Sequence, residues 1–422
     1  MLPRRRALLA GLGVGLGAGL GAAVLAPVAL AGPARRETVR IAFIDPLSGP
    51  AADIGRNGLR SWQFMAEHVG RQMGEGGPRF LVAGFDNKAS PHESVNMLKA
   101  AIDQGFRYIV QGNGSGAAAA LSATVTRHNQ QHPERAVVFI NYAAMDPSLT
   151  AERCSFWHFR IDADTAMKMR ALVGFMTTLP ELRKIYLLNQ NYAHGQQFAR
   201  YFREEVALQQ PSLDIVGDEL HPLFQDIDFR PYVRRIRASG AQALVTGNWG
   251  ADMRGLVAAL QSEKLRVPLF AYYPALTGTP RLLARQPEAM PVYQVAYNHS
   301  NQEGPVADLA DAFRQEYGED LVVYAAYDGM VMLTQAMAFT GSTEPRVVAP
   351  RLSGMVFPGF NGPVQLRADD HQLQKGLYIS RWQPVDERNP RDAEGTGFTF
   401  APLHYIPGAD LATPVRCQMH RP

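Results

Sequence analysis

Cysteine is nearly absent from this chain, since Cys154 and Cys417 are the only two among 422 residues. Two thiols are too few for a cysteine-based metal site, and no Cys-x-x-Cys spacing occurs. In an exported protein two cysteines can form a disulfide, which here would join the end of the chain to its middle. The alternative is a pair of separate thiols, and the sequence leaves both open.

The chain also lacks a strong excess of either charge. Its formal net charge is +3, and the 42 lysines and arginines form no long basic run. Proteins that bind nucleic acids usually concentrate positive charge on one face, because they neutralise phosphates. The sequence therefore predicts no nucleic-acid partner.

Long apolar runs are scarce, and one of them stands at the N-terminus. Arginines at positions 4 to 6 precede an apolar stretch over residues 7–31, which ends in the small-residue sequence Ala-Leu-Ala. This arrangement predicts a signal peptide at residues 1–31, and export by the Sec or the twin-arginine route. A retained membrane anchor is the alternative, disfavoured because alternating glycines weaken a helix and Pro27 stands before the cleavage site.

Beyond the leader, short β-branched or aromatic runs alternate with amphipathic segments. Strands are predicted at 38–44, 79–85, 107–111, 136–141, 184–189, 213–220, 243–248 and 267–272, with helices between them. This alternation predicts two α/β lobes built on parallel, doubly wound sheets. Two further helices, at 305–317 and 324–340, are too few for a third lobe, so we expect them to complete the first. Residues 382–397 are polar and rich in turn formers, and predict a surface loop.

One glycine-rich loop, QGNGSGA at residues 111–117, joins a predicted strand to a helix. It lacks the first-strand position and the acidic partner of a dinucleotide fingerprint, and the lysine of a P-loop. Ser115 also lacks the glycines that a hydrolase nucleophile elbow needs two residues on either side. We interpret Gly114, Ser115 and Gly116 as a cup for a small anion at a helix N-terminus, with a plain helix cap as the alternative. We expect no cofactor and no metal.

Three stretches, at residues 39–70, 189–202 and 226–261, resemble periplasmic leucine/isoleucine/valine-type solute-binding proteins of ABC importers. Taken with their order, their spacing and the export signal, the resemblance covers about residues 38–380. It implies a type I periplasmic-binding-protein fold, in which the ligand cleft lies between two lobes joined by a three-strand hinge. The implied first lobe comprises 37–160 and 296–372, and the second 161–295 and 373–422. The implied hinge strands lie near 159–162, near 295–298 and around Gly376.

The function implied by the resemblance is capture of a small amino acid, amide or carboxylate in the periplasm. The protein would act as a monomer and deliver its ligand to ABC permease and ATPase subunits in the inner membrane. A ligand-sensing or ligand-presenting subunit with the same fold is the alternative. A hydrolase is a remote third hypothesis, because it needs a nucleophile with a base in reach, and only Ser115 and His194 offer that pair. We expect no enzymatic activity.

The resemblance also assigns residues to the ligand site. Ser115 falls on the serine that grips the ligand carboxylate, and residues 143–145 fall on the turn that completes this grip, with Met145 in place of the usual threonine. The residues that we expect at the ligand are Ile54, Gly114, Ser115, Gly116, Tyr142, Ala143, Ala144, Met145, Tyr192, His194, Trp249, Asp252 and Tyr273.

Tyr273 marks the largest departure from the family pattern, because amino-acid binders place an acidic residue there for the α-ammonium group. A buried ammonium without a charge partner costs several kcal/mol. The sequence therefore favours a ligand without an amine, held against an aromatic wall that includes Tyr142, Trp249, Tyr272 and Tyr273. Asp252 and Asp45 are the alternative partners for an ammonium group.

Overall fold

The computed structural model describes residues 37–74 and 76–422, so the predicted signal peptide lies outside the described residues. The first sheet has the strand order β2-β1-β3-β4-β5, and all its pairings are parallel. Its strands are β1 (Thr38–Asp45), β2 (Arg79–Asp86), β3 (Tyr108–Gln111), β4 (Val138–Asn141) and β5 (His158–Arg160). We call this sheet and the helices packed on it the first lobe.

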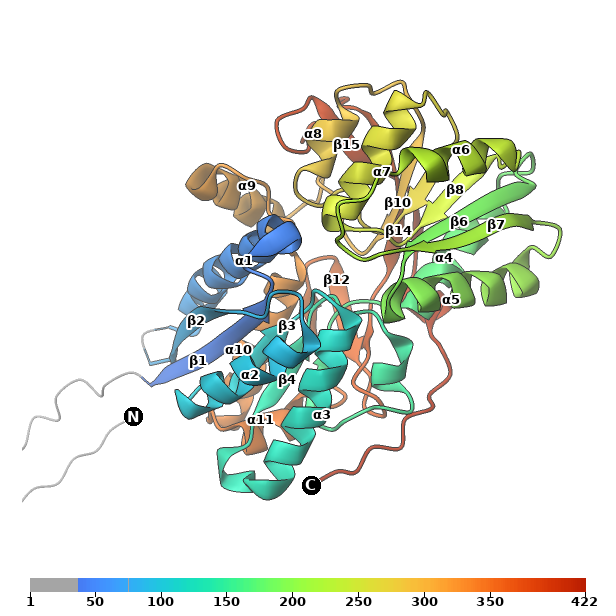
Figure 1. Cartoon of the computed structure of the whole chain (residues 1–422). Helices are drawn as coiled ribbons and strands as arrows, with labels where there is room; N and C mark the ends of the chain where they lie inside the picture. The colour runs from blue at the N-terminus through green and yellow to red at the C-terminus, as the bar shows by residue number, and fades with distance from the viewer. Residues whose placement is uncertain (1–36, 75) are drawn as a thin grey trace, which may run out of the picture. The chain divides into compact units, whose positions relative to one another are not determined.

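Helices cover the first sheet (Figure 1). Those between its strands are α1 (Ala52–Arg71), α2 (Pro91–Asp103) and α3 (Ser115–Gln131), with short 3-10 helices η1 (Gly49–Ala51), η2 (Pro133–Arg135) and η3 (Pro147–Thr150). Three helices from late in the chain are α9 (Pro305–Tyr317), α10 (Ala325–Thr340) and α11 (Pro345–Leu352). α10 packs on α1, and Phe313 of α9 lies edge-on to Phe64 of α1, with ring centroids 5.4 Å apart. The late helices therefore return to the first lobe.

The second sheet has seven strands in the order β15-β14-β10-β9-β8-β6-β7. They are β6 (Lys184–Gln190), β7 (Asp214–His221), β8 (Ala243–Thr246), β9 (Leu269–Ala271), β10 (Val292–Ala296), β14 (Leu377–Pro384) and β15 (Phe398–Ile406). Its helices are α4 (Thr165–Met176), α5 (Ala193–Gln209), α6 (Arg230–Ala238), α7 (Gly250–Ser262) and α8 (Thr279–Leu283). We call this sheet with its helices the second lobe.

Three strands of the second sheet, β10, β14 and β15, were not among the predicted strands, although the implied hinge near 295–298 overlaps β10. β14 pairs antiparallel with both β10 and β15. The predicted surface loop at 382–397 is therefore wrong at its start, because Trp382 is buried in β14 and stacks on Phe398 at 5.5 Å between ring centroids. Polar residues and turn formers after Trp382 concealed the end of the strand, whereas the contact that buries Trp382 comes from the next strand of the hairpin.

The main chain passes between the lobes three times, between β5 and α4, between β10 and α9, and just before β14. A small antiparallel sheet of β11 (Val356–Gly359), β12 (Gly362–Leu366) and β13 (Leu373–Gln374) leads into the third crossing. Across residues 37–74 and 76–422, no helix combines the length and the apolar composition that crossing a membrane requires.

The C-terminal tail forms a fourth link between the lobes. After η4 (Gly408–Leu411), which packs on α4, the tail runs along the first lobe to the C-terminus (Figure 1). Arg367 donates a hydrogen bond to the carbonyl of Thr413 at 2.8 Å. Cys417 is bonded to Cys154, with 5.7 Å between the two Cα atoms. The tail is thus covalently attached to the first lobe.

Candidate functional site

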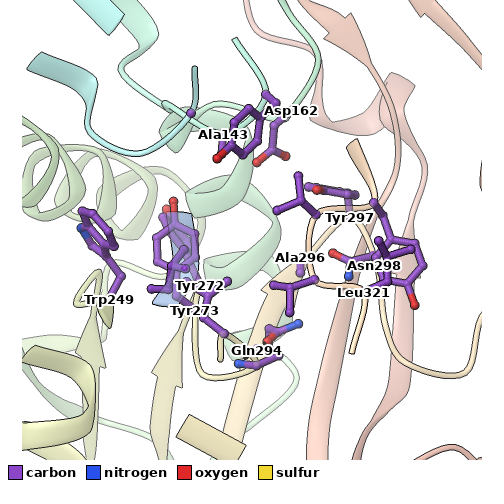
Figure 2. Close-up of a pocket in the computed structure, with 18 of the residues that line it drawn as sticks. Ala143, Asp162, Trp249, Tyr272, Tyr273, Gln294, Ala296, Tyr297, Asn298 and Leu321 are labelled. Carbon is purple, nitrogen blue, oxygen red and sulfur yellow. Dashed lines mark hydrogen bonds between the residues drawn. The ribbon is translucent and has the colours of Figure 1, made fainter. Parts of the chain in front are cut away.

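A large cavity lies where the two lobes meet, and most of the residues that we predicted for the ligand line it (Figure 2). From that prediction, the lining contains Ile54, Gly114, Ser115, Tyr142, Ala143, Ala144, Met145, Tyr192, His194, Trp249 and Tyr273. These side chains come from strand ends and helix starts on both lobes, which is where ligands bind in open α/β sheets.

The glycine-rich loop forms the first-lobe side of the cavity. Gly114 precedes α3 with a φ of 104°, a left-handed conformation that favours glycine, and Ser115 is the first residue of the helix. A Cβ atom on Gly112 would lie 2.6 Å from the ring of Tyr142, so only glycine fits there. The loop therefore starts α3 at the cavity, where the first-turn N–H groups favour an anion.

Asp45 holds this loop from behind. Its side chain is fully buried and accepts hydrogen bonds from the N–H of Asn113 at 2.9 Å, the N–H of Gly112 at 3.3 Å and the hydroxyl of Tyr142 at 2.5 Å. Burial raises the pKa of Asp45 to about 7, and these hydrogen bonds lower it only in part. The Asp45 carboxyl group therefore stabilises the glycine-rich loop, and Asp45 is not among the described residues that line the cavity.

The pKa of Asp45 predicts a pH-dependent stability. Between about pH 4 and pH 7 the folded protein holds this proton, whereas the unfolded carboxyl, with a pKa of 3.8, has released it. The free energy of unfolding should therefore fall as pH rises through this window, by about 1.4 kcal/mol per pH unit, and level off above pH 7. Urea unfolding of wild type and Asp45→Asn at pH 5 and pH 7 measures this slope.

Asp45→Asn should lose that part of the slope, because an amide has no proton to release. Asp53→Asn is the control, since Asp53 lies on the same lobe with 31% of its side chain exposed. Identical slopes in wild type and Asp45→Asn would contradict the prediction.

The turn at residues 143–145, which we predicted to complete the binding of the ligand carboxylate, makes hydrogen bonds within the protein. The N–H groups of Ala143 and Ala144 both donate to the side-chain oxygen of Asn141, at 3.2 and 2.8 Å. The sulfur of Met145 accepts a hydrogen bond from the Tyr273 hydroxyl at 3.4 Å. This turn lines the cavity, but the N–H groups of Ala143 and Ala144 already have partners, so we take Ser115 as the principal polar group of the cup.

Aromatic side chains form much of the remaining wall. The residues are Tyr142, Tyr192, His194, Trp249, Tyr272, Tyr273 and Tyr297. The indole N–H of Trp249 donates to the Tyr192 hydroxyl at 2.8 Å, and the Trp249 ring lies edge-on to Phe224 at 4.7 Å. Ile54 packs against Trp249 from the opposite lobe. Tyr297 belongs to this wall but was predicted only as part of a hinge strand.

His194 has a structural partner in the second lobe. Its Nε2 lies 3.1 Å from the carbonyl oxygen of Gly247, which requires that this nitrogen carry the proton. Burial lowers the pKa of His194 to about 4, so the ring is neutral at neutral pH. Within residues 37–74 and 76–422 no hydrogen bond joins His194 to Ser115, which leaves the hydrolase hypothesis without an assembled nucleophile and base.

Two predicted ligand residues, Asp252 and Gly116, lie outside the cavity lining of the described chain. Asp252 is buried in the first turn of α7, where its carboxylate accepts from the Gln190 side chain at 2.7 Å and from the N–H of Phe224 at 2.9 Å. Gly116 faces α2, because a Cβ atom on it would lie 3.3 Å from Pro91. Asp252 lies close in sequence to Trp249, and Gly116 is next to Ser115. In a helix, however, neighbouring residues point in different directions, and neither Asp252 nor Gly116 is directed into the cavity.

A buried ion pair that was not predicted from the sequence lies in the cavity wall. The ammonium of Lys168 lies 2.9 Å from the carboxylate of Asp162, and both side chains are 3% exposed. The same ammonium lies 5.4 Å from the ring centroid of Tyr272 and 5.8 Å from that of Tyr273. Lys168 between two methionines of α4, close to a predicted hinge strand, was the available signal.

Contacts around the cavity also join the lobes directly. Arg254 of α7 lies 3.0 Å from Asp53 of α1, and the side-chain amide of Gln197 donates to Asp146 at 2.7 Å. Together with the Ile54–Trp249 contact, these interactions close the cleft over the cavity. A ligand that touches both walls would stabilise this arrangement relative to an open one.

Comparison with known proteins identifies a matching family and several relatives of this chain. A family model described as periplasmic binding protein matches residues 38–389. A Leu/Ile/Val-binding protein homolog 4 from Brucella abortus (strain 2308) is 26% identical, with 94% of this chain and 97% of the relative covered.

Solved structures show the same fold. The closed conformation of a leucine-, isoleucine-, valine-, threonine- and alanine-binding protein from Brucella ovis has a TM-score of 0.81 and 24% identity, and covers 92% of this chain and 100% of its own. An ABC transporter solute-binding protein from Rhodopseudomonas palustris BisB5, in complex with 3,4-dihydroxybenzoic acid, has a TM-score of 0.74 and 18% identity, and covers 88% and 98%.

Proposed function

Because this chain belongs to the periplasmic binding protein family, we propose that it captures a small monocarboxylate without an amino group and delivers it to the permease of an ABC importer. The observation that carries the proposal is the pairing of the Ser115 cup with an aromatic wall in one cavity. The N-terminus of α3 and the Ser115 hydroxyl suit a carboxylate, and the tyrosines and Trp249 suit an aromatic or branched apolar body.

The second-lobe wall argues against an α-amino acid. Tyr273 contributes a hydroxyl where amino-acid binders have a carboxylate, and that hydroxyl is directed to the sulfur of Met145. The Asp252 carboxylate accepts hydrogen bonds from the side chain of Gln190 and the N–H of Phe224, and Asp252 does not line the cavity of the described chain. Neither Tyr273 nor Asp252 would supply a negative charge to an ammonium group held beside Tyr273.

Cleft closure is the working step of this proposal. We take the lobes as 37–160 with 296–372 and 161–295 with 373–422, on either side of the cavity, with the tail after Leu411 crossing back to the first lobe. A ligand that contacts Ser115 on one lobe and Trp249 on the other binds the closed state better than the open one, and only such a difference shifts the equilibrium. The closed form would then dock, as a monomer exported to the periplasm, on the permease and ATPase subunits.

Matched ligand pairs test the proposal directly. Leucine and 4-methylpentanoate differ by the amine, as do phenylalanine and 3-phenylpropanoate, and benzoate adds a shorter aromatic acid. Calorimetry and thermal unfolding should show binding of the amine-free member of at least one pair, with about 2.7 kcal/mol of added stability at 100 times Kd. Binding of the amino acids with no binding of their amine-free partners would overturn the proposal.

Removal of the Ser115 hydroxyl should weaken this binding. A hydrogen bond to a charged group contributes about 1.5 to 3 kcal/mol, so Ser115→Ala should raise Kd by roughly 10- to 100-fold. Ser122→Ala is the matched control, because Ser122 is a buried serine of the same helix that is not among the residues lining the cavity. An unchanged Kd in Ser115→Ala would show that the Ser115 hydroxyl does not bind the ligand.

A further inference from the structure

The cavity contains one acidic side chain at the place where a ligand ammonium group would need it. An α-ammonium is attached one carbon from its carboxylate, so its partner must lie beside the carboxylate cup. Asp162 lines the same cavity as Ser115, and its segment is hydrogen-bonded to the segment that carries the 143–145 turn: the N–H of Ile161 donates to the carbonyl of Asn141 at 2.9 Å, and that of Thr165 to the carbonyl of Met145 at 3.0 Å. Figure 2 shows Asp162 beside Ala143 in the cavity wall.

The other acidic residues of the cavity wall form ion pairs with arginines in another part of the cavity. Among the described lining residues, Asp311 pairs with Arg391, while Asp320 and Asp392 pair with Arg314. These ion pairs lie around α9 and the loop after β14, outside the aromatic wall. Asp162 is therefore the acidic group in a position to neutralise an amine next to the cup.

The Asp162 carboxylate already forms an ion pair with Lys168. Its ammonium donates to Asp162 at 2.9 Å, and the rings of Tyr272 and Tyr273 enclose it. A ligand ammonium that approached Asp162 would have to share the carboxylate with a second buried cation or displace Lys168 from it. Either arrangement leaves a positive charge without adequate compensation in a region closed to water.

We propose that Lys168 determines the ligand specificity of this site: its ammonium takes the place that the α-ammonium of an amino acid would occupy on Asp162, and so restricts the cavity to carboxylates without an amine. The inference rests on the proposed function, because it assumes that the ligand carboxylate binds at the Ser115 cup. It adds the residue responsible and predicts that the preference can be reversed by one substitution.

The substitution is Lys168→Met, which keeps the length of the side chain and removes the charge. It leaves the buried Asp162 carboxylate without its cation, with the N–H of Ala163 still donating to it at 2.6 Å, so the variant should unfold at a lower temperature than wild type. Leucine or phenylalanine should then supply the missing cation. We expect the affinity for one of these amino acids to rise at least tenfold over wild type, and its addition to raise the unfolding temperature of the variant more than 4-methylpentanoate or 3-phenylpropanoate does.

The chain contains a matched control for the loss of a buried lysine. Lys375 lies 2.9 Å from Asp328, with 5% and 1% of the two side chains exposed, and neither residue is among those that line the large cavity. Lys375→Met should lower the unfolding temperature to a similar degree without any gain in amino-acid affinity. The double variant Asp162→Asn with Lys168→Met should also lack the gain, because no carboxylate remains for the amine.

The outcomes separate this inference from the proposed function. If wild type binds amine-free carboxylates and Lys168→Met gains no amino-acid binding, the role of Lys168 is overturned and the proposed function stands. If wild type binds leucine or phenylalanine and neither of the amine-free partners, both fail. Should Lys168→Met not fold alone, refolding it with leucine or with 4-methylpentanoate gives the answer: recovery with leucine only supports the inference, and equal recovery or none overturns it.

Discussion

Replacement of both Cys154 and Cys417 by serine is expected to lower the free energy of unfolding by a few kcal/mol, with about 5 kcal/mol as the upper value. The disulfide joins residues 263 positions apart, so its loss releases a very long loop in the unfolded chain. In the folded protein it fixes the tail that links the two lobes. Urea unfolding of the wild type and the double variant under oxidising conditions gives the difference.

Reduction supplies the control for this prediction. Treatment of the wild-type protein with a reductant should reproduce the stability of the double variant, whereas the variant itself should not respond. A wild-type protein whose unfolding midpoint ignores the reductant would show that the bond contributes nothing to stability under these conditions.

Arg160→Met is expected to destabilise the protein by about 3 to 5 kcal/mol, the usual result of removing one partner of a buried ion pair. The Arg160 side chain is fully buried at the first crossing between the lobes and lies 3.1 Å from the carboxylate of Asp164. It also donates to the side chain of Gln372 at 2.5 Å and to the carbonyl of Asp146 at 2.6 Å. Its loss would leave all three acceptors without their partner in the interior.

Urea unfolding at neutral pH again provides the measurement, and Arg200→Met is the matched control. Arg200 also pairs with an acid four residues away, Glu204, but its side chain is 62% exposed. Exposed pairs of this kind contribute about 0.3 to 0.5 kcal/mol. A loss below 1 kcal/mol in Arg160→Met would mean that water reaches the site and replaces the guanidinium.

The predicted family and the predicted α/β fold class are confirmed. Both followed from local sequence features, because strand and helix periodicities record which face of each segment is buried. The glycine loop was informative for the same reason, since Gly114 and Ser115 have local tasks, a left-handed turn and the first position of a helix. The hairpin strand β14 was missed because its burial depends on β15.

What the sequence by itself determined about this protein is its family, its α/β fold and the stretches of chain that border the cleft. The tertiary structure alone decided which side chains of those stretches reach the cavity, since Asp252 and Gly116 face away from it while Asp162 and Lys168 line it. The physical reason is that periodicity fixes local structure, whereas helix rotation and ion pairing inside the cleft depend on contacts between segments far apart in the chain. The charge balance of the ligand site is therefore a property of the folded molecule.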